Sequence, residues 1–334
     1  TLDLRSNATV GTVHLVSGNI TGSDDTLTSN SAFNVESGTI SANLAGTAAL
    51  TKTTVGVVTL SGTNNTYSGD TLVQAGVLRL GAAGALSPNT TLNVSPGAKF
   101  EANGHAAAFA QLNGTGDIDV GTGGLTVSPN SGTNTFAGRL IGVGGLIKNG
   151  AGTLELSGTH TFTGETRIDA GRLRLNGSAA GSAFRVNDGG ILSGSGTLGS
   201  LTIASGGTLA PGNSPGTLNA GDTVWDSGGN FNFEIDNATG SSGSNWDLLA
   251  ISGTLTINAL VGDQFTLDID TLISGTSTAG AMANFDANTS QEWIFVTTTG
   301  GITFGENASI GASFSLNTTG FANATNGTFS VTLA

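Results

Sequence analysis

The chain has 334 residues, of which 54 are glycine, 37% are hydrophobic and only 10% are charged, a composition that excludes a disordered chain and marks the glycines as turn residues. The net charge of −13 argues against a nucleic-acid partner, because ten Lys and Arg cannot assemble the basic patches that phosphates require. The absence of cysteine excludes disulfides and thiol catalysis.

Short alternating segments separated by turns fill the chain from Leu2 to about Leu218. Two aliphatic residues flank a polar one in Leu92-Asn93-Val94 and in Leu154-Glu155-Leu156, as in half-buried strands. No window has a sustained helical period. Two architectures fit this pattern: a sandwich of many hairpins, or a right-handed parallel β-helix, a solenoid whose coils of 20 to 25 residues would number about ten.

One segment occurs twice and favours the solenoid. LSGTNNTYSGDTLVQAGVLRL ends at Leu80 and LSGTHTFTGETRIDAGRLRL ends at Leu175, and Lys52 and Lys148 precede the two copies at the same spacing. A duplicated unit must alternate in direction in a hairpin stack, whereas every coil of a parallel β-helix is equivalent. The copies share turn glycines and inward aliphatics, so the repeat specifies a coil and leaves recognition to its outward positions.

The pattern changes after the turn sequence APGNSPGTL at residues 210–218. Longer, more aromatic strands follow, and after Arg185 the chain has twelve acidic residues and no Lys or Arg. We therefore expect two domains: a parallel β-helix over 1–218, with repeats at 50–80 and 146–175, and an acidic, aromatic-richer β cap over 219–334. Because the last coil of a solenoid exposes apolar surface and unpaired backbone, we expect this cap to be an antiparallel sheet or sandwich.

Several acidic residues are candidates for chemistry, but none forms a converging set in the sequence. The adjacent pair Asp24 and Asp25 has the context of a solvated turn. Asp117 and Asp119 share an outward face that is a cation candidate, with an exposed soluble edge as the preferred interpretation. In the expected cap, four acids alternate outward on two strands, where a calcium site is the alternative to solvated charge: Glu234, Asp236, Asp268 and Asp270.

The remaining candidates are basic, glycine-rich or amide side chains. His14, His105 and His160 lack metal-type spacing, and His160 falls in the turn of the repeat where the first copy has Asn64 or Asn65. A basic patch would form if the equivalent strands stacked Arg79, Arg172 and Arg174, although an exposed soluble face is preferred. GSGTLG at residues 194–199 opens no helix, and the Asn-x-Ser/Thr triplets include those at Asn7, Asn64, Asn237 and Asn317. No residue is assigned a catalytic, cofactor-binding or metal-binding role, and no cofactor is expected.

The repeated units around 50–80 and 146–175 resemble the autotransporter-associated β-strand repeat of bacterial surface proteins, and SGTNTFAG at residues 131–138 is a weaker third candidate. The stretch at 210–218 with the acidic region after it is similar to exported repeat proteins that end in a Pro-Glu-Pro sorting tail. The resemblance implies a right-handed β-helix, export from a Gram-negative-type cell, and display at the surface or in extracellular matrix. A membrane barrel and a sorting tail are missing from this sequence, which we expect to be a processed or partial chain.

The sequence therefore predicts a non-enzymatic structural or adhesive β-helix at a bacterial cell surface or in its matrix. Self-association or surface partners are expected, with end-to-end assembly through the strand that begins at Leu2, and no transmembrane segment is present. The alternative is a polysaccharide-active enzyme or glycan-binding module that uses one exposed sheet face.

Overall fold

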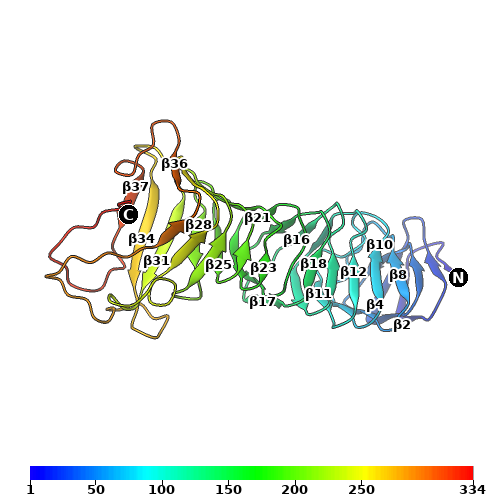
Figure 1. The fold of residues 1–334 in the computed structure, drawn as a ribbon. Helices are drawn as coiled ribbons and strands as arrows, with labels where there is room; N and C mark the ends of the chain where they lie inside the picture. The colour runs from blue at the N-terminus through cyan, green and yellow to red at the C-terminus, as the bar shows by residue number, and fades with distance from the viewer. Residues whose placement is uncertain (334) are drawn as a thin grey trace. The chain divides into compact units, whose positions relative to one another are not determined.

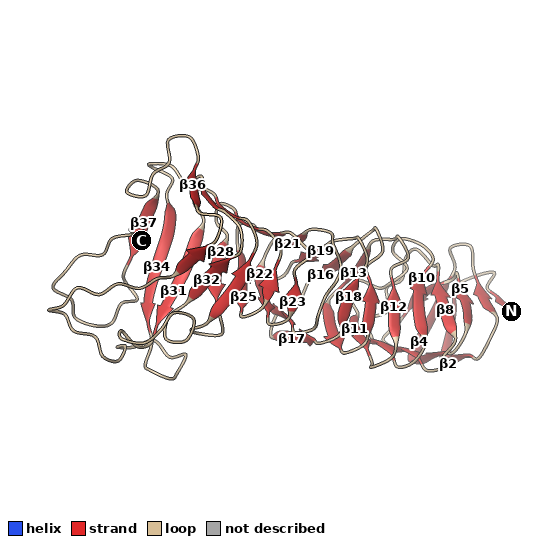
Figure 2. Ribbon diagram, viewed as in Figure 1, coloured by secondary structure: helices blue, strands red, loops and turns tan. Residues whose placement is uncertain are grey.

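The computed structural model describes residues 1–333, and among these residues it contains strands and turns but no helix (Figures 1 and 2). The chain divides by its internal contacts into two units, residues 1–166 and 167–334. Each unit is a stack of parallel β-coils. The prediction of an all-β parallel solenoid is therefore confirmed.

The first unit carries three sets of stacked strands. Each set contains one strand from successive coils, and the partners run parallel. The first set is β1 (Leu2–Asp3), β3 (Asn19–Thr21), β5 (Gly38–Ile40), β8 (Val57–Leu60), β10 (Val77–Leu80), β12 (Lys99–Glu101), β15 (Asp117–Asp119) and β18 (Arg139–Ile141). The second is β2 (Ala8–Leu15), β4 (Thr26–Val35), β7 (Leu50–Lys52), β9 (Thr71–Val73), β11 (Thr91–Val94), β14 (Gln111–Gly114), β17 (Thr133–Phe136) and β20 (Thr153–Leu156), with β6 (Asn43–Ala45) beside β4. The third is β13 (Ala107–Phe109), β16 (Leu125–Val127) and β19 (Leu146–Lys148).

The second unit repeats the plan, and β21 (Thr166–Ile168) lies at the division between the units. Its longest set is β22 (Gly171–Leu175), β25 (Gly190–Gly194), β28 (Thr208–Pro211), β31 (Asn230–Ile235), β34 (Phe265–Thr271) and β37 (Phe314–Asn317). A second set is β24 (Phe184–Val186), β27 (Leu201–Ile203), β30 (Thr223–Trp225), β33 (Leu255–Ile257) and β36 (Ile302–Phe304). A third is β23 (Ser178–Ala179), β26 (Thr197–Leu198), β29 (Thr217–Ala220), β32 (Leu248–Ile251) and β35 (Val296–Thr298).

The interior of each unit is built from equivalent residues of successive coils. Leu92 is the register partner of Leu112 in the next coil, and both are fully buried. Asn93, between two buried residues of β11, lies on the outer side, as the alternation of strand side chains requires. Each buried Leu, Val, Ile or Phe stabilises the stack by about 1.5–3 kcal/mol relative to an exposed one. The stacked rows are therefore the source of the solenoid's stability.

The two copies of the repeat have the same backbone geometry in their turns. The carbonyl of Leu44 accepts hydrogen bonds from the amides of Thr66 and Tyr67, and the carbonyl of Leu140 accepts them from the two equivalent amides in the second copy. Glycine is required where these turns touch the previous coil, because a Cβ on Gly62 would lie 2.4 Å from the carbonyl oxygen of Ala42 and one on Gly158 would lie 1.9 Å from that of Gly138. The repeat therefore encodes a turn that seats directly on the coil before it.

The weaker third copy at residues 131–138 does not form this turn. Its residues Thr133–Phe136 are strand β17, which pairs with β20 in the register Phe136 to Leu156. The interpretation of this segment as a repeat copy is therefore wrong. The similarity of residues 131–138 to the turn of the repeat did not reveal that this segment forms a strand.

The expectation of an antiparallel cap after residue 218 is also wrong, because strands β29 to β37 pair in parallel. β31 and β34 run side by side over six residue pairs, from Asn230 opposite Thr266 to Ile235 opposite Thr271. The bulky residues fill a wider coil interior, where the Trp225 and Phe265 rings stack 4.6 Å apart. Parallel and antiparallel half-buried strands share the same period of two, so the pattern did not distinguish them. The predicted domain boundary at 218 stays a prediction.

Candidate functional site

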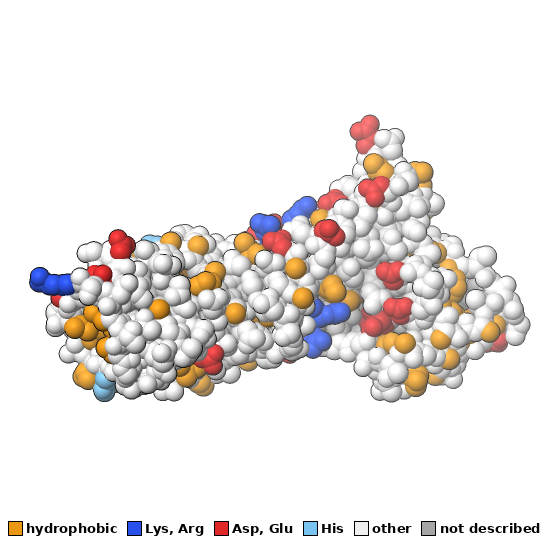
Figure 3. Space-filling model, turned by 180° about the vertical axis from the view of Figure 1, so that it is seen from behind, with side chains coloured by type: hydrophobic (Ala, Val, Ile, Leu, Met, Phe, Trp, Pro, Cys, Tyr) orange, Lys and Arg blue, Asp and Glu red, His pale blue; other side chains and the backbone are white. Residues whose placement is uncertain are grey.

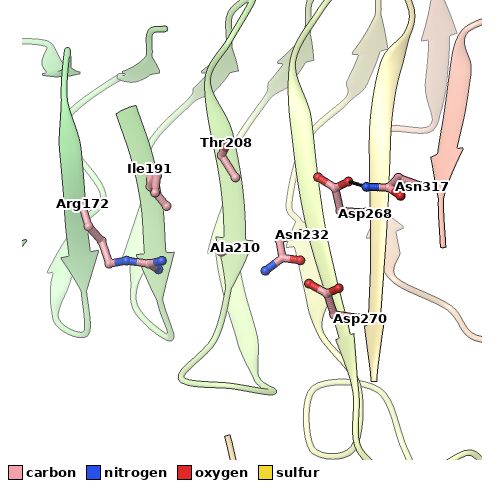
Figure 4. A pocket seen from close by; sticks show the side chains of 8 residues that line it. All are labelled: Arg172, Ile191, Thr208, Ala210, Asn232, Asp268, Asp270 and Asn317. Carbon is pink, nitrogen blue, oxygen red and sulfur yellow. Dashed lines mark hydrogen bonds between the residues drawn. The ribbon is translucent and has the colours of Figure 1, made fainter. Parts of the chain in front are cut away.

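A shallow groove of about 330 Å³ runs across the outer face of the second unit (Figure 4). All six strands of its longest set, β22 to β37, contribute outward residues. At about 4.8 Å per strand, the five steps from β22 to β37 make it roughly 24 Å long. Its lining is Arg172, Ile191, Thr208, Ala210, Asn232, Asp268, Asp270 and Asn317.

The groove is polar at both ends and smooth in between. Arg172 on β22 extends over Ile191, while Asp268 and Asp270 on β34 lie at the other end (Figure 4). The Asn317 amide donates a hydrogen bond of 2.7 Å to Asp268. Ile191, Thr208, Ala210 and Asn232 line the groove between these ends. An elongated molecule with hydroxyl or charged groups along it would find a donor at the Arg172 end and carboxylate acceptors at the Asp268 and Asp270 end.

Like charges meet at the acidic end, and this changes their ionisation. Glu234 on β31 is the register partner of Asp270. Burial raises the pKa of Glu234, and the carboxylate of Asp270 raises it further, although hydrogen bonding from Ser214 and the charge of Arg172 oppose the rise. Burial and the neighbouring Asp268 raise the pKa of Asp270. Burial lowers the pKa of Arg172. These groups are therefore desolvated and their charges are incompletely compensated.

Two further acids of this region are clamped to the backbone. Asp247 is buried and accepts hydrogen bonds from the amides of Gly216 (2.9 Å) and Glu234 (3.0 Å), and burial raises its pKa well above the usual range. Asp236 was expected to face outward but is buried, with its carboxylate bound to the Gly275 amide and the Asn245 side chain. The four acids considered as an alternative calcium site therefore do not converge, because Asp236 is held elsewhere. No group of three or more metal-ligating side chains occurs among residues 1–333.

In the first unit, cations on the same or neighbouring strands neutralise Glu101, Asp117 and Asp119. Asp117 on β15 forms a two-point pair with Arg139 on β18, with contacts of 2.7 and 3.0 Å, and this hydrogen bonding lowers its pKa. Asp119 lies 3.3 Å from Lys99 on β12. Burial opposes ionisation of Glu101, but hydrogen bonds from Lys99 and from Arg79 (2.6 Å) outweigh it and lower its pKa. The cation site considered for Asp117 and Asp119 is therefore replaced by a ladder of ion pairs.

Arg79 does not lie beside Arg172 and Arg174, the residues with which it was considered for a basic patch. Arg79 lies on β10, whose neighbours are β8 and β12, so its register partners are Thr59 and Glu101. Arg172 and Arg174 share β22, where burial and then the charge of Arg174 lower the pKa of Arg172. The condition for a shared basic patch is therefore not met, because Arg79 has its register partners within its own sheet.

The other sequence candidates have ordinary structural environments. Asp24 and Asp25 lie in a turn whose carbonyls accept hydrogen bonds from Asn43. His14 points outward and lies 2.9 Å from Glu36. His105 lies in a turn in which its amide binds the Ala102 carbonyl. The segment 194–199 contains the end of β25 and the start of β26 and opens no helix. The Asn237 and Asn317 side chains hydrogen-bond within the chain.

Sequence reasoning missed the role of the repeated lysines, which are fully buried. Lys52 donates to the carbonyls of Thr54 and of Ala75, the second at 3.1 Å in the next coil. Lys148 donates to the carbonyls of Asn149 (3.0 Å) and Gly150 (2.8 Å), and burial lowers its pKa to about 8. The signal was present, because alternation from Leu50 through Thr51 places Lys52 inward. These lysines satisfy carbonyls that the turns leave unpaired.

Charged side chains form separate spots on a largely uncharged surface (Figure 3). None of the described residues belongs to a helix with the length and apolarity needed to cross a membrane. The fold and surface thus define a repeat-built solenoid whose equivalent coils carry different outward residues.

Comparison with known proteins identifies the repeat. Residues 50–80 and 146–175 match the passenger-associated-transport-repeat. The chain is 40% identical over 103 residues to an extracellular serine protease of Serratia marcescens, a match that covers 30% of this chain and 10% of that protein. It is 32% identical over 232 residues to the adhesin BmaC autotransporter of Brucella suis, covering 60% of this chain and 6% of the relative. An uncharacterized Escherichia coli protein, YuaQ, is 27% identical over 155 residues, 46% of this chain and 10% of its own length.

The chain carries two copies of a passenger-type repeat, as its repeated segment predicted, and it is exported to the cell surface or the extracellular space. It spans a tenth or less of the length of these relatives.

Proposed function

We propose that this chain is a non-enzymatic, adhesive segment of a surface protein and that it contacts surface or matrix partners through its outer strand faces. The observation that carries the proposal is that the two repeat copies agree at structural positions and differ at outward ones. Most of their shared residues are turn glycines or inward aliphatics, whereas Leu72 in the first copy is replaced by the exposed Arg167 in the second. The adhesin relative supports this role, because its match extends over 60% of the chain.

The groove favours a glycan as the partner, which makes a glycan-binding module the second candidate function. Carboxylates and amides accept and donate hydrogen bonds to sugar hydroxyls, and Asn232, Asp268 and Asn317 supply these groups along one line. Arg172 at the other end suits a sugar carboxylate, since a guanidinium binds carboxylates through two parallel hydrogen bonds. The floor of Ile191, Thr208 and Ala210 leaves room for an extended chain.

A binding assay with matched variants tests both functions. The purified chain is applied to arrays of neutral and acidic oligosaccharides and to matrix-coated surfaces, together with Asp268→Asn/Asp270→Asn and Arg172→Ala. The control is Asp117→Asn, which removes an acid from the outer face of the first unit. We expect the groove variants to lose at least tenfold in affinity and the control to bind normally. Equal binding by all variants would exclude the groove, and turnover of a polysaccharide would exclude the non-enzymatic function.

Self-association through the N-terminal edge stays a prediction. Among the named strands, β1 pairs with β3 and β2 pairs with β4, and Val10 and Val16 beside this edge are 39% and 55% exposed. Light scattering over a concentration series is the measurement, and a monomer at the highest concentration would contradict it.

A further inference from the structure

One buried position in the turn of the repeat is occupied by Asn65 in the first copy and by His160 in the second. In both copies the side chain accepts a hydrogen bond from a backbone amide of the previous coil. Asn65 Oδ1 accepts from the Leu44 amide at 2.5 Å, and His160 Nδ1 accepts from the Leu140 amide at 3.2 Å. The carbonyls of the same two leucines accept from the residues that follow. The structure thus aligns His160 with Asn65 and makes Asn64 the inserted residue.

The two side chains differ in how completely they are satisfied. Asn65 also donates to the carbonyls of Gly62 (3.1 Å) and Ala85 (2.8 Å), so it links three coils. His160 is 3% exposed, and its Nε2 is buried without a hydrogen-bond partner among the described residues. Because Nδ1 accepts the Leu140 amide, the ring must be neutral with its proton on Nε2. The His160 side chain therefore makes one hydrogen bond, to the previous coil, whereas the Asn65 side chain makes three.

Apolar rings surround His160. Phe136 lies against it at 6.3 Å between ring centres and Phe162 at 6.4 Å. The charged side chains on the packed elements are Arg139 of β18, which pairs outward with Asp117, Glu155 on the outward side of β20, and the exposed Glu165. Burial alone lowers the pKa of His160 to about 4. A protonated ring would have no compensating charge here.

We infer that the turn Ser157–Gly164 is an acid-sensitive joint, because a protonated His160 cannot accept the Leu140 amide and the turn then separates from the coil before it. The corresponding turn Ser61–Gly69 stays closed, since the Asn65 amide does not titrate. Acidification of the medium around an exported protein would thus open the solenoid at one defined place and expose that turn to solvent and proteases. The inference does not depend on the adhesive role or on the groove.

Hydrogen exchange of the full chain, followed by mass spectrometry between pH 7 and pH 4, tests this joint. Each variant is compared with the wild type at the same pH, so that intrinsic exchange rates cancel. We expect opening of 157–164 to increase roughly 100-fold between pH 7 and pH 4, from the difference between the open-state and closed-state pKa of one histidine. His160→Asn should abolish this increase, and Asn65→His should create it in 61–69.

Three results would overturn the inference. One is an unchanged acid response of 157–164 in His160→Asn. Another is an equal response of 61–69 in the wild type, which would indicate general acid unfolding. The third is an Asn65→His variant that is folded by circular dichroism yet insensitive to acid. If Asn65→His does not fold, His160→Asn alone decides, because asparagine already occupies this site in the first copy.

Discussion

The outer faces of the two units use charge in opposite ways. In the first unit, unlike charges are neighbours in register, as with Arg79 and Glu101 or Asp117 and Arg139. In the second, the like charges Glu234 and Asp270 are register neighbours, and the charge of Arg172 compensates Glu234 only in part. Equivalent coils can therefore present either a neutralised face or one whose charges remain available. This difference is the reason to place binding on the second unit.

The largest expected effect comes from the buried acid of the second unit. Asp247→Ala should lower the free energy of unfolding by about 3 kcal/mol, because two buried amides lose their acceptor. Urea denaturation measures the loss. Asp247→Asn keeps the volume of the side chain and one of the two acceptor oxygens, so it should lose less than the alanine variant, while its NH2 group faces the other amide. An equal loss in both variants would show that charge, not acceptor geometry, matters at this position.

The buried cation of the first unit should have the next largest effect. Lys148→Met should destabilise the protein by about 2 kcal/mol, since it leaves the Asn149 and Gly150 carbonyls without their donor. Lys99→Met, at a half-exposed ion-pair position, is the control and should cost about 1 kcal/mol or less. The folded pKa of Lys148 is about 8 and its ordinary value is 10.5, so the wild type should gain stability as pH rises between them. Lys148→Met should lack that gain.

Neutralising one acid in each unit should change the stability of the protein in opposite directions. Glu101→Gln should destabilise by about 1 kcal/mol, because it removes the partner of Arg79 and Lys99. Asp270→Asn should stabilise by about 0.5 kcal/mol, because it relieves repulsion from Asp268 and Glu234. Thermal melts at low salt compare the two. The same sign in both variants would remove the contrast between the faces.

Acid should destabilise β12 and β15 of the first unit more than β31 and β34 of the second. The lowered pKa values of Glu101 and Asp117 mean that their stabilisation is lost as pH falls through the folded values. The raised values of Glu234 and Asp270 mean that stability there falls as pH rises between the unfolded and folded values. Between pH 7 and pH 3, exchange of β12 and β15 should therefore quicken relative to that of β31 and β34, by about threefold. Equal changes would contradict the assigned directions.

The sequence predicted the coils well and the partners of polar groups poorly. Alternation such as Leu154-Glu155-Leu156 states which side of a strand a residue faces, and this reading was correct for most of the solenoid. It does not state which strand lies alongside, so the parallel pairing of β31 with β34 and the ion pair of Arg79 with Glu101 were missed. Asp236 follows the last residue of β31, where the chain turns and the alternation no longer holds.

The seating of each turn on the coil before it also sets how such a chain can change in length. Register partners lie one coil apart, as with Leu92 and Leu112 or Leu125 and Leu146. Removing or adding one whole coil would leave every remaining residue opposite an equivalent neighbour. A change of a few residues within a strand would instead shift every contact across that rung. Growth and shrinkage by whole coils is thus the low-cost route for this architecture, while insertions are confined to the turns.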